Sequence, residues 1–144
     1  MHTSFENCTR HDFETIFHLL TQLWPSRDLD YNRLNKVFVK GLEAQNQLYL
    51  KMVMDKKIIG FSAISFLNTL YGNGALCHID EIVIDEAYRG KGLGKKFIEY
   101  ISETGRLRGC ETLELESAIH RNEAHRFYDN LGFERMGLVF SKSL

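Results

Sequence analysis

A glycine-rich, cationic stretch, Arg89–Lys96, has the composition of a phosphate-binding turn. Its three glycines let the backbone take positive φ angles and come close to a ligand. The chain has a formal net charge of −1, yet this stretch carries four cations: Arg89, Lys91, Lys95 and Lys96. The stretch lies between a predicted strand and a predicted amphipathic helix, whose first N–H groups lack partners within the helix. Unpaired N–H groups, a helix dipole and cations together favour the binding of a phosphate group.

Three phosphate-binding patterns can be compared with this turn. The P-loop pattern needs a glycine five residues before Gly-Lys-Ser/Thr, which the chain lacks, so nucleotide hydrolysis is excluded on pattern. The dinucleotide pattern GxGxxG needs its third glycine one residue later than Gly94, and the strands before the turn look antiparallel. The pattern Arg/Gln-x-x-Gly-x-Gly/Ala is matched at every position by Arg89, Gly92 and Gly94.

The predicted strand before the turn carries His78, Asp80 and Glu81 within four positions. Because side chains alternate between the two faces of a strand, His78 and Asp80 should share one face and Glu81 the other. A bulge at this point would re-aim either carboxylate. The three side chains could also recruit a divalent ion, but no two histidines stand at ligand spacing around them, and we expect no metal site.

The elements that must position these residues follow from the apolar patterns and the turn residues. Helices are expected over residues 13–24, 31–42, 93–108 and 121–131, the last capped by Gly132. Strands are expected over residues 5–9, 48–54, 58–67, 75–84, 111–116 and 133–140. The order β-α-α-β-β-β-α-β-α-β predicts an α/β (α+β) domain with a mixed, largely antiparallel sheet and helices on both faces.

A second motif, Asn122–Phe133, lies about thirty residues after the glycine turn, with Ala124, Phe127 and Tyr128 on a helix and Gly-Phe after it. Together the two motifs and the order of elements resemble the GNAT superfamily of N-acetyltransferases over nearly the whole chain. Within it, the helix motif, the ending Phe140–Leu144 and the length are most similar to the small aminoalkylphosphonate N-acetyltransferases. The glycine turn departs from that subfamily, because it is closer to the general GNAT consensus.

The resemblance implies acetyl-CoA as co-substrate. Its pyrophosphate would lie on the turn formed by Arg89, Gly90, Lys91, Gly92, Leu93, Gly94 and Lys95. The backbone of Ile82, Val83 and Ile84 would pair with the pantetheine arm and polarise the thioester carbonyl, although their side chains are also plain core. Asn122 would contact the pantetheine amides, with helix N-capping as the equal alternative. Phe127 would be a packing residue, and the cofactor is one of the surfaces against which it could pack.

The resemblance also implies direct transfer, in which an amine attacks the thioester in a ternary complex. Such a reaction needs a proton acceptor for the amine and a proton donor for the departing thiolate. Tyr128, with an ordinary pKa near 10 that keeps it protonated, is the candidate acid. Glu81 is the candidate base, with Asp80 or a water chain as the alternative. A cysteine thiolate is not expected to act, because direct transfer needs none.

Composition and length predict a single N-acetyltransferase domain over residues 1–144. The small net charge gives no case for nucleic acid or membrane as a partner. The three cysteines, without a CxxC pair, favour free thiols, and the first residues resemble no targeting segment, so we expect a cytoplasmic protein.

The expected acceptor is a small-molecule amine, with an aminoalkylphosphonate as the leading candidate. The alternatives are a protein, peptide, aminoglycoside or polyamine acceptor, or a non-catalytic domain that binds acyl-CoA and regulates. A homodimer is expected from the resemblance alone.

Overall fold

The computed structural model describes residues 2–144 and follows the predicted order of elements as far as residue 130. It falls into two compact units, one ending at Glu114 and one spanning Leu115–Leu144. The elements of the first unit are β1 (Thr3–Asn7), α1 (Phe13–Leu23), α2 (Tyr31–Glu43), β2 (Gln47–Met54), β3 (Lys57–Thr69), β4 (Gly74–Ile84) and α3 (Leu93–Leu107). The short β5 (Leu113–Leu115) crosses the boundary, and α4 (Asn122–Asn130) belongs to the second unit. The single-domain expectation stays a prediction.

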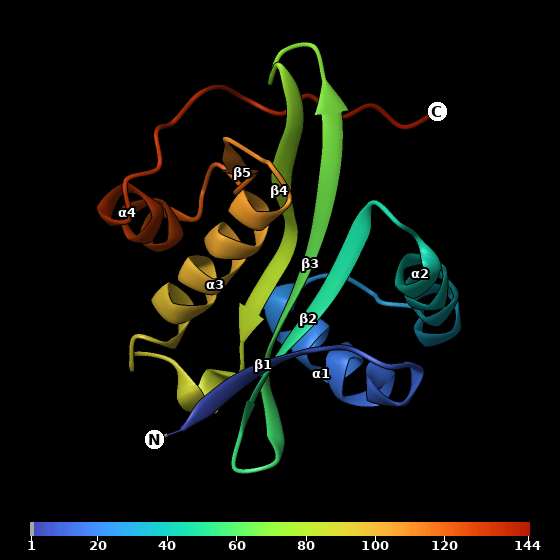
Figure 1. Ribbon diagram of the computed structural model, residues 1–144. Helices are drawn as coiled ribbons and strands as arrows, with labels where there is room; N and C mark the ends of the chain where they lie inside the picture. The colour runs from blue at the N-terminus through green and yellow to red at the C-terminus, as the bar shows by residue number, and fades with distance from the viewer. Residues whose placement is uncertain (1) are drawn as a thin grey trace. The chain divides into compact units, whose positions relative to one another are not determined.

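One sheet joins the five strands in the order β1-β2-β3-β4-β5 (Figure 1). The pairs from β1 to β4 are antiparallel, and tight turns connect β2 to β3 and β3 to β4. The first turn has positive φ at Asp55 and Lys56, as a two-residue hairpin turn with right-handed strand twist requires. The second turn contains Asn73 and Gly74, also at positive φ. The two turns fall in the gaps between the strands predicted over residues 48–54, 58–67 and 75–84.

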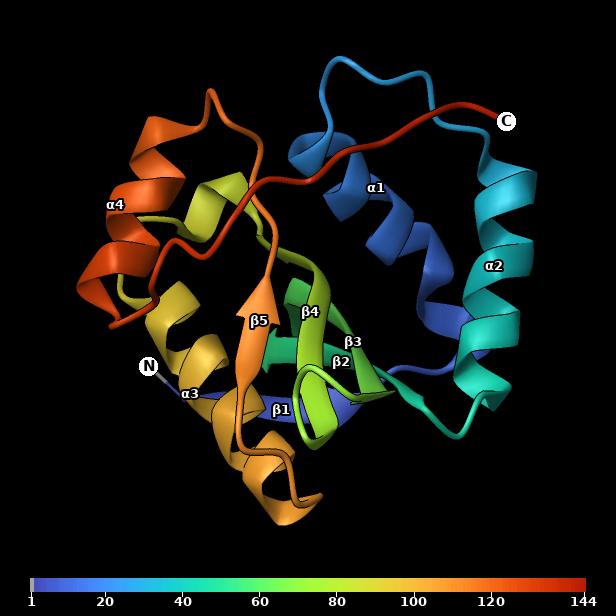
Figure 2. The ribbon, with the colours of Figure 1, turned by 90° about the horizontal axis from the view of Figure 1, so that it is seen from above.

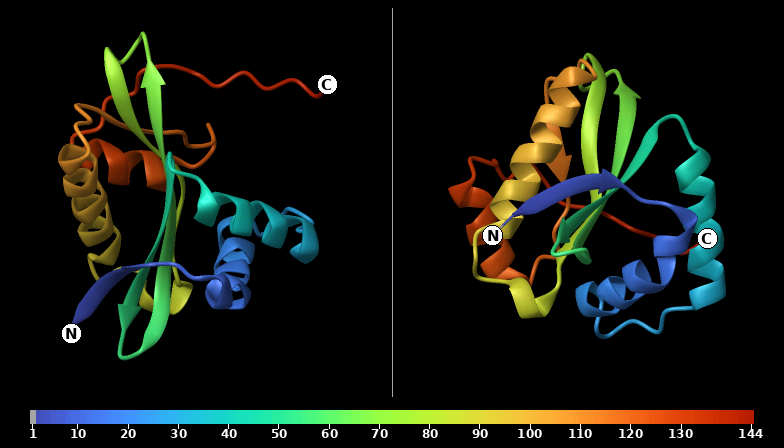
Figure 3. Two further views of the ribbon diagram at one scale, coloured as in Figure 1. Left: turned by 45° about the vertical axis from the view of Figure 1, so that its right-hand side comes forward. Right: turned by 60° about the horizontal axis from the view of Figure 1, so that its bottom comes forward.

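Helices cover both faces of the sheet in the first unit. The left view of Figure 3 shows α3 on one side of the strands and α1 with α2 on the other, and Figure 2 shows the same layers from above. The core on the side of α1 and α2 is apolar and aromatic, and it contains Phe13, Ile16, Leu19, Phe38, Tyr49, Phe61, Ala63 and Val83. On the other side α3 buries Leu93, Phe97, Ile98 and Ile101. The α/β class with helices on both faces is therefore confirmed.

The last predicted strand, residues 133–140, is wrong. Residues 131–144 contain no strand, and none of the strand pairings of residues 2–144 includes them. Four apolar side chains of this segment are exposed, from 63% for Val139 to 91% for Phe140, and they are Met136, Leu138, Val139 and Phe140. β-branched and aromatic residues favour a strand only where a neighbouring strand can pair with them. Arg135 instead binds back to Asp129, with its Nη2 2.7 Å from Asp129 Oδ2.

No helix within residues 2–144 is both long and apolar enough to cross a membrane.

Candidate active site

A β-bulge in β4 sets the geometry of the predicted carboxylates. Ala63 of β3 lies opposite Glu81, and the next residue of β3, Ile64, lies opposite Ile79, so Asp80 is an extra residue in β4. Residues opposite one another in a sheet point to the same face. Tyr49, Ala63 and Glu81 therefore form one row across three strands, on the face that α1 and α2 cover.

The bulge corrects the expectation that Glu81 and His78 point to opposite faces. His78 lies opposite Ser65, two residues from Ala63 on the same face of β3. With one extra residue between them, His78 and Glu81 are three positions apart yet share that face. The alternation of side chains along an unbroken strand predicts the opposite and is wrong here, whereas the bulge considered as the alternative is present.

Glu81 is half-buried, and its carboxyl resists ionisation. Burial, followed by the negative charge of Asp80, raises the pKa of Glu81 to about 7, while the charges of His78 and Arg27 lower it. The same carboxylates act on the neighbour in the row: burial and the charges of Glu81 and Asp80 raise the pKa of Tyr49 to about 12. A carboxyl with a pKa near the working pH can both accept and release a proton, which suits a general base.

Asp80 is held at both carboxylate oxygens. Its Oδ1 lies 2.7 Å from His78 Nδ1, and its Oδ2 accepts a 2.5 Å hydrogen bond from Ser65 Oγ. The side chains of His78 and Asp80 are 19% and 26% exposed, and Ser65 is buried. Ser65 and Tyr49 escaped the sequence analysis because only the register of β3 and β2 brings them to this point.

The glycine turn follows the end of β4 with the conformation that its sequence predicts. Gly90 and Gly92 have φ of 78° and 76°, and Gly92 caps the N-terminus of α3. A Cβ atom built on either glycine would meet nothing within 4 Å, so the turn is open above its backbone. Arg89 joins the turn to the strand, because its Nε donates a 2.8 Å hydrogen bond to the carbonyl of Ile84.

The cations and backbone of this turn can hold a diphosphate. Lys91, Lys95 and Lys96 are exposed, whereas Leu93 packs into the core and Gly94 is half-buried at the start of α3. α3 has fifteen residues, so the dipole at its N-terminus is well developed. Open glycines, helix N–H groups and exposed cations fit an anionic ligand.

The strand end before the turn combines a packed side with a weakly covered edge. Val83 is buried, Ile82 and Ile84 are half-buried, and Ser62 Oγ of β3 donates to the carbonyl of Glu81 at 2.9 Å. β5 has only three residues against the eleven of β4. Most of the outer edge of β4 is therefore not paired with β5.

Three predicted site residues lie in the second unit, and they are Asn122, Phe127 and Tyr128. Tyr128 packs between Phe127 and Phe133, with ring centroids 5.3 and 5.6 Å away. Burial raises the pKa of Tyr128 and the charge of Arg121 lowers it, with burial the larger effect, so the hydroxyl stays protonated at neutral pH. Asn122 is the first residue of α4 and Arg121 is its N-cap, so the capping role considered for Asn122 is wrong.

The cysteines lack the properties of a nucleophile. Burial raises the pKa of Cys8 and of Cys77 to about 12, and it also raises the pKa of Cys110. Since the thiolate is the reactive form, these thiols are unreactive near neutral pH. Residues 2–144 contain no group of three or more His, Cys, Asp or Glu arranged to hold a metal ion.

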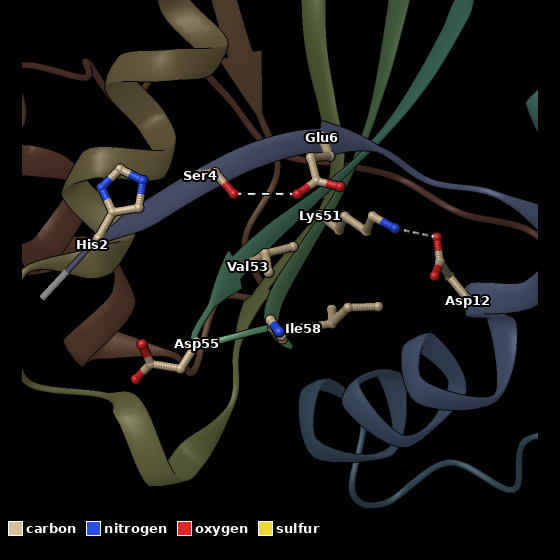
Figure 4. A pocket seen from close by; sticks show the side chains of 9 residues that line it. His2, Ser4, Glu6, Asp12, Lys51, Val53, Asp55 and Ile58 are labelled. Carbon is tan, nitrogen blue, oxygen red and sulfur yellow. Dashed lines mark hydrogen bonds and ion pairs between the residues drawn. The ribbon is translucent and has the colours of Figure 1, made fainter.

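A pocket of about 550 Å³ lies beside β1 and β2, away from the predicted site residues (Figure 4). The carboxylate of Asp12 and the Nζ of Lys51, 2.8 Å apart, form an ion pair on its wall. The remaining lining residues are His2, Ser4, Glu6, Val53, Asp55, Lys56 and Ile58. None of these residues was predicted to act in catalysis, and acids and bases are mixed along the wall.

Comparison with known proteins agrees with this architecture. A sequence model of the acetyltransferase (GNAT) family matches residues 10–133. Aminoalkylphosphonate N-acetyltransferase of Salmonella typhimurium is 26% identical over 138 residues, which cover 96% of this chain and 89% of that protein. Glucosamine 6-phosphate N-acetyltransferase of Trypanosoma brucei brucei is 40% identical over 62 residues, which cover 43% of this chain and 40% of that protein. A solved aminoglycoside N-acetyltransferase in complex with CoA has a TM-score of 0.86 at 19% identity, with 99% of this chain and 95% of that one covered.

Proposed function

The chain belongs to the acetyltransferase (GNAT) family, and from that membership we propose that it acetylates the amine of a small molecule that carries a phosphonate or phosphate group. The family makes it an N-acetyltransferase with acetyl-CoA as co-substrate. An aminoalkylphosphonate is the leading candidate acceptor. The observation that carries this proposal is the match to an aminoalkylphosphonate N-acetyltransferase over 96% of the chain.

The second relative supports the phospho group rather than one particular amine. Its name specifies glucosamine 6-phosphate, so both relatives are named for an amine with an anionic phosphorus group. Arg27, in the connection between α1 and α2, is close enough to Glu81 to lower the pKa of its carboxyl. Its guanidinium lies 4.6 Å from the centre of the Trp24 ring. A guanidinium fixed near the base is suited to the anionic end of such an acceptor.

Glu81 is proposed as the general base. At a pKa of about 7 its carboxylate is present at neutral pH and still basic enough to take a proton from an ammonium group. Asp80 is the weaker candidate, since both of its oxygens already accept hydrogen bonds. A proton taken up by Asp80 would displace one of these two donors.

The other chemical roles follow the family motifs. Acetyl-CoA supplies the activated acetyl group as a thioester. The backbone N–H groups and cations of Arg89–Lys95 would hold its pyrophosphate, and the backbone of Ile82–Ile84 would hold the pantetheine arm and polarise the carbonyl. The Tyr128 hydroxyl would give a proton to the departing thiolate, and Asn122 and Phe127 would contact the arm from α4.

A panel of matched amines tests the acceptor. The purified chain is incubated with acetyl-CoA and one amine at a time, and release of free CoA thiol is followed. The panel pairs 2-aminoethylphosphonate with ethylamine and glucosamine 6-phosphate with glucosamine, and adds a polyamine, an aminoglycoside and a lysine peptide. We expect turnover of phosphonate or phosphate amines to exceed that of their partners lacking phosphorus. Equal turnover within both pairs, or turnover of the peptide alone, would refute the proposed acceptor class.

The same assay tests the remaining alternative, a regulatory domain without catalysis. Binding of acetyl-CoA with no thiol release from any amine would support that alternative against the enzyme. The homodimer and the cytoplasmic location expected from the sequence stay proposals.

A further inference from the structure

The bulge of β4 gathers three side chains that the proposed chemistry does not use directly. Asp80, the extra residue, is bonded to His78 of its own strand and to Ser65 of β3. Ser65 is 8% exposed, and His78 and Asp80 are mostly covered. A carboxylate held by a partner at each of its two oxygens is fixed in direction.

We propose that Ser65, Asp80 and His78 form a positioning cluster for Glu81, in which Ser65 and His78 fix the Asp80 carboxylate beside the carboxyl of Glu81. In this proposal the three residues act through Glu81. This inference rests on the proposed role of Glu81 as the base, and its test separates the two.

Titratable and charged groups from three parts of the fold act on Glu81 or are acted on by it. Asp80 and His78 lie on β4, Arg27 lies in the α1–α2 connection, and Tyr49 lies on β2. Asp80 is the only one whose charge raises the pKa of Glu81, and among the causes of the shift it comes second to burial. His78 and Arg27 act in the opposite direction. The basicity of Glu81 therefore depends on a balance in which the effect of Asp80 opposes the effects of His78 and Arg27.

The bulge explains why this balance needs a fixed carboxylate. Asp80 and Glu81 are adjacent in sequence, and the bulge turns both toward the face of Tyr49 and Ser65. Two carboxylates at such close range each make ionisation of the other harder. Both hydrogen-bond partners in the cluster bind Asp80, so its carboxylate is fixed in direction beside the Glu81 carboxyl.

The decisive variants are Asp80→Asn and His78→Gln, since the two side chains act on the pKa of Glu81 in opposite directions and each replacement keeps a polar group of similar size. Each protein is labelled with ¹³C at the glutamate carboxyl, and the titration of Glu81 is followed by NMR, with Glu81→Gln used to assign the signal. The acidic limb of kcat/KM against pH is measured on the same proteins. We expect Asp80→Asn to move both to lower pH by about one unit. His78→Gln should move both to higher pH.

If Asp80 and His78 had a purely structural role, both variants would lower the rate. They would not shift the Glu81 titration in opposite directions. Glu6→Gln on β1, at the far edge of the sheet, removes a carboxylate outside the site and should leave both readouts unchanged. Ser65→Ala should give a smaller shift in the direction of Asp80→Asn, because Asp80 loses one of its two donors.

An unmoved Glu81 titration in Asp80→Asn would overturn the cluster. If Asp80→Asn fails to fold, His78→Gln is tested by the same two measurements. A shift of the Glu81 titration to higher pH would then support the cluster, and no shift or a shift to lower pH would overturn it. A Glu81 titration that moves while the rate profile stays in place would uphold the cluster and overturn Glu81 as the base.

Discussion

Replacing Glu81 by glutamine should produce a loss of activity whose size depends on pH in a defined way. The variant keeps the volume and polarity of the side chain but cannot accept a proton. It must therefore use the small fraction of acceptor that is already a free amine, whereas the natural protein can use the abundant ammonium form.

The pKa of Glu81 fixes the shape of this dependence. Below its pKa of about 7, the ionised base and the free amine both fall about tenfold per pH unit, so the ratio of the two rates is constant. Above pH 7 the base is ionised while free amine continues to increase, up to an amine pKa of about 10, as for lysine. The deficit should shrink about tenfold per unit over this range. It is then on the order of 10³-fold at neutral pH, within the usual range for general base assistance.

The assay is kcat/KM for the acceptor at saturating acetyl-CoA from pH 6 to 9.5, with thermal unfolding followed at each pH. A deficit that is constant below pH 7 and declines above it supports the base. A uniform loss at every pH would show that Glu81 positions the acceptor instead of moving a proton. No loss at all would refute the assignment and favour Asp80 or a water chain.

Three further predictions test the cofactor turn, the acid and the packing. Gly92→Val should abolish acetyl-CoA binding by calorimetry, because a side chain is strained at a φ of 76° and the turn must change its conformation. The circular dichroism should stay native, because no atom lies within 4 Å of a Cβ built there. Tyr128→Phe should lower kcat by about 10²-fold or more with acetyl-CoA affinity retained, because only a hydroxyl is lost; an unchanged kcat would exclude Tyr128 as the acid. Gly41→Ala should destabilise by about 1–3 kcal/mol in urea unfolding, since its Cβ would overlap the Tyr49 ring, whereas Gly137→Ala, in open space, should be neutral.

Local sequence patterns were enough to predict most of the elements and the chemistry that they carry. The glycine turn could be recognised because Gly90 and Gly92 are needed where the backbone takes positive φ. Periodicity located the four helices, and alternation with turn residues located the first four strands. Each of these signals depends on neighbours within a few positions of the chain. The motif Asn122–Phe133, which contains Tyr128, is also recognised from residues that are close together in the sequence.

Tertiary structure alone decided where the carboxylates point and whether the last strand forms. The extra residue at Asp80 exists only relative to β3, since a bulge is a mismatch between two paired strands. That mismatch puts Glu81 on the face of His78, against the alternation that its own strand predicts, and brings Ser65 and Tyr49 beside them. Residues 133–140 have the composition of a strand, but within residues 2–144 no strand pairing includes them. Sequence specifies the preference of a segment, and the hydrogen bonds that realise it must come from a partner elsewhere in the fold.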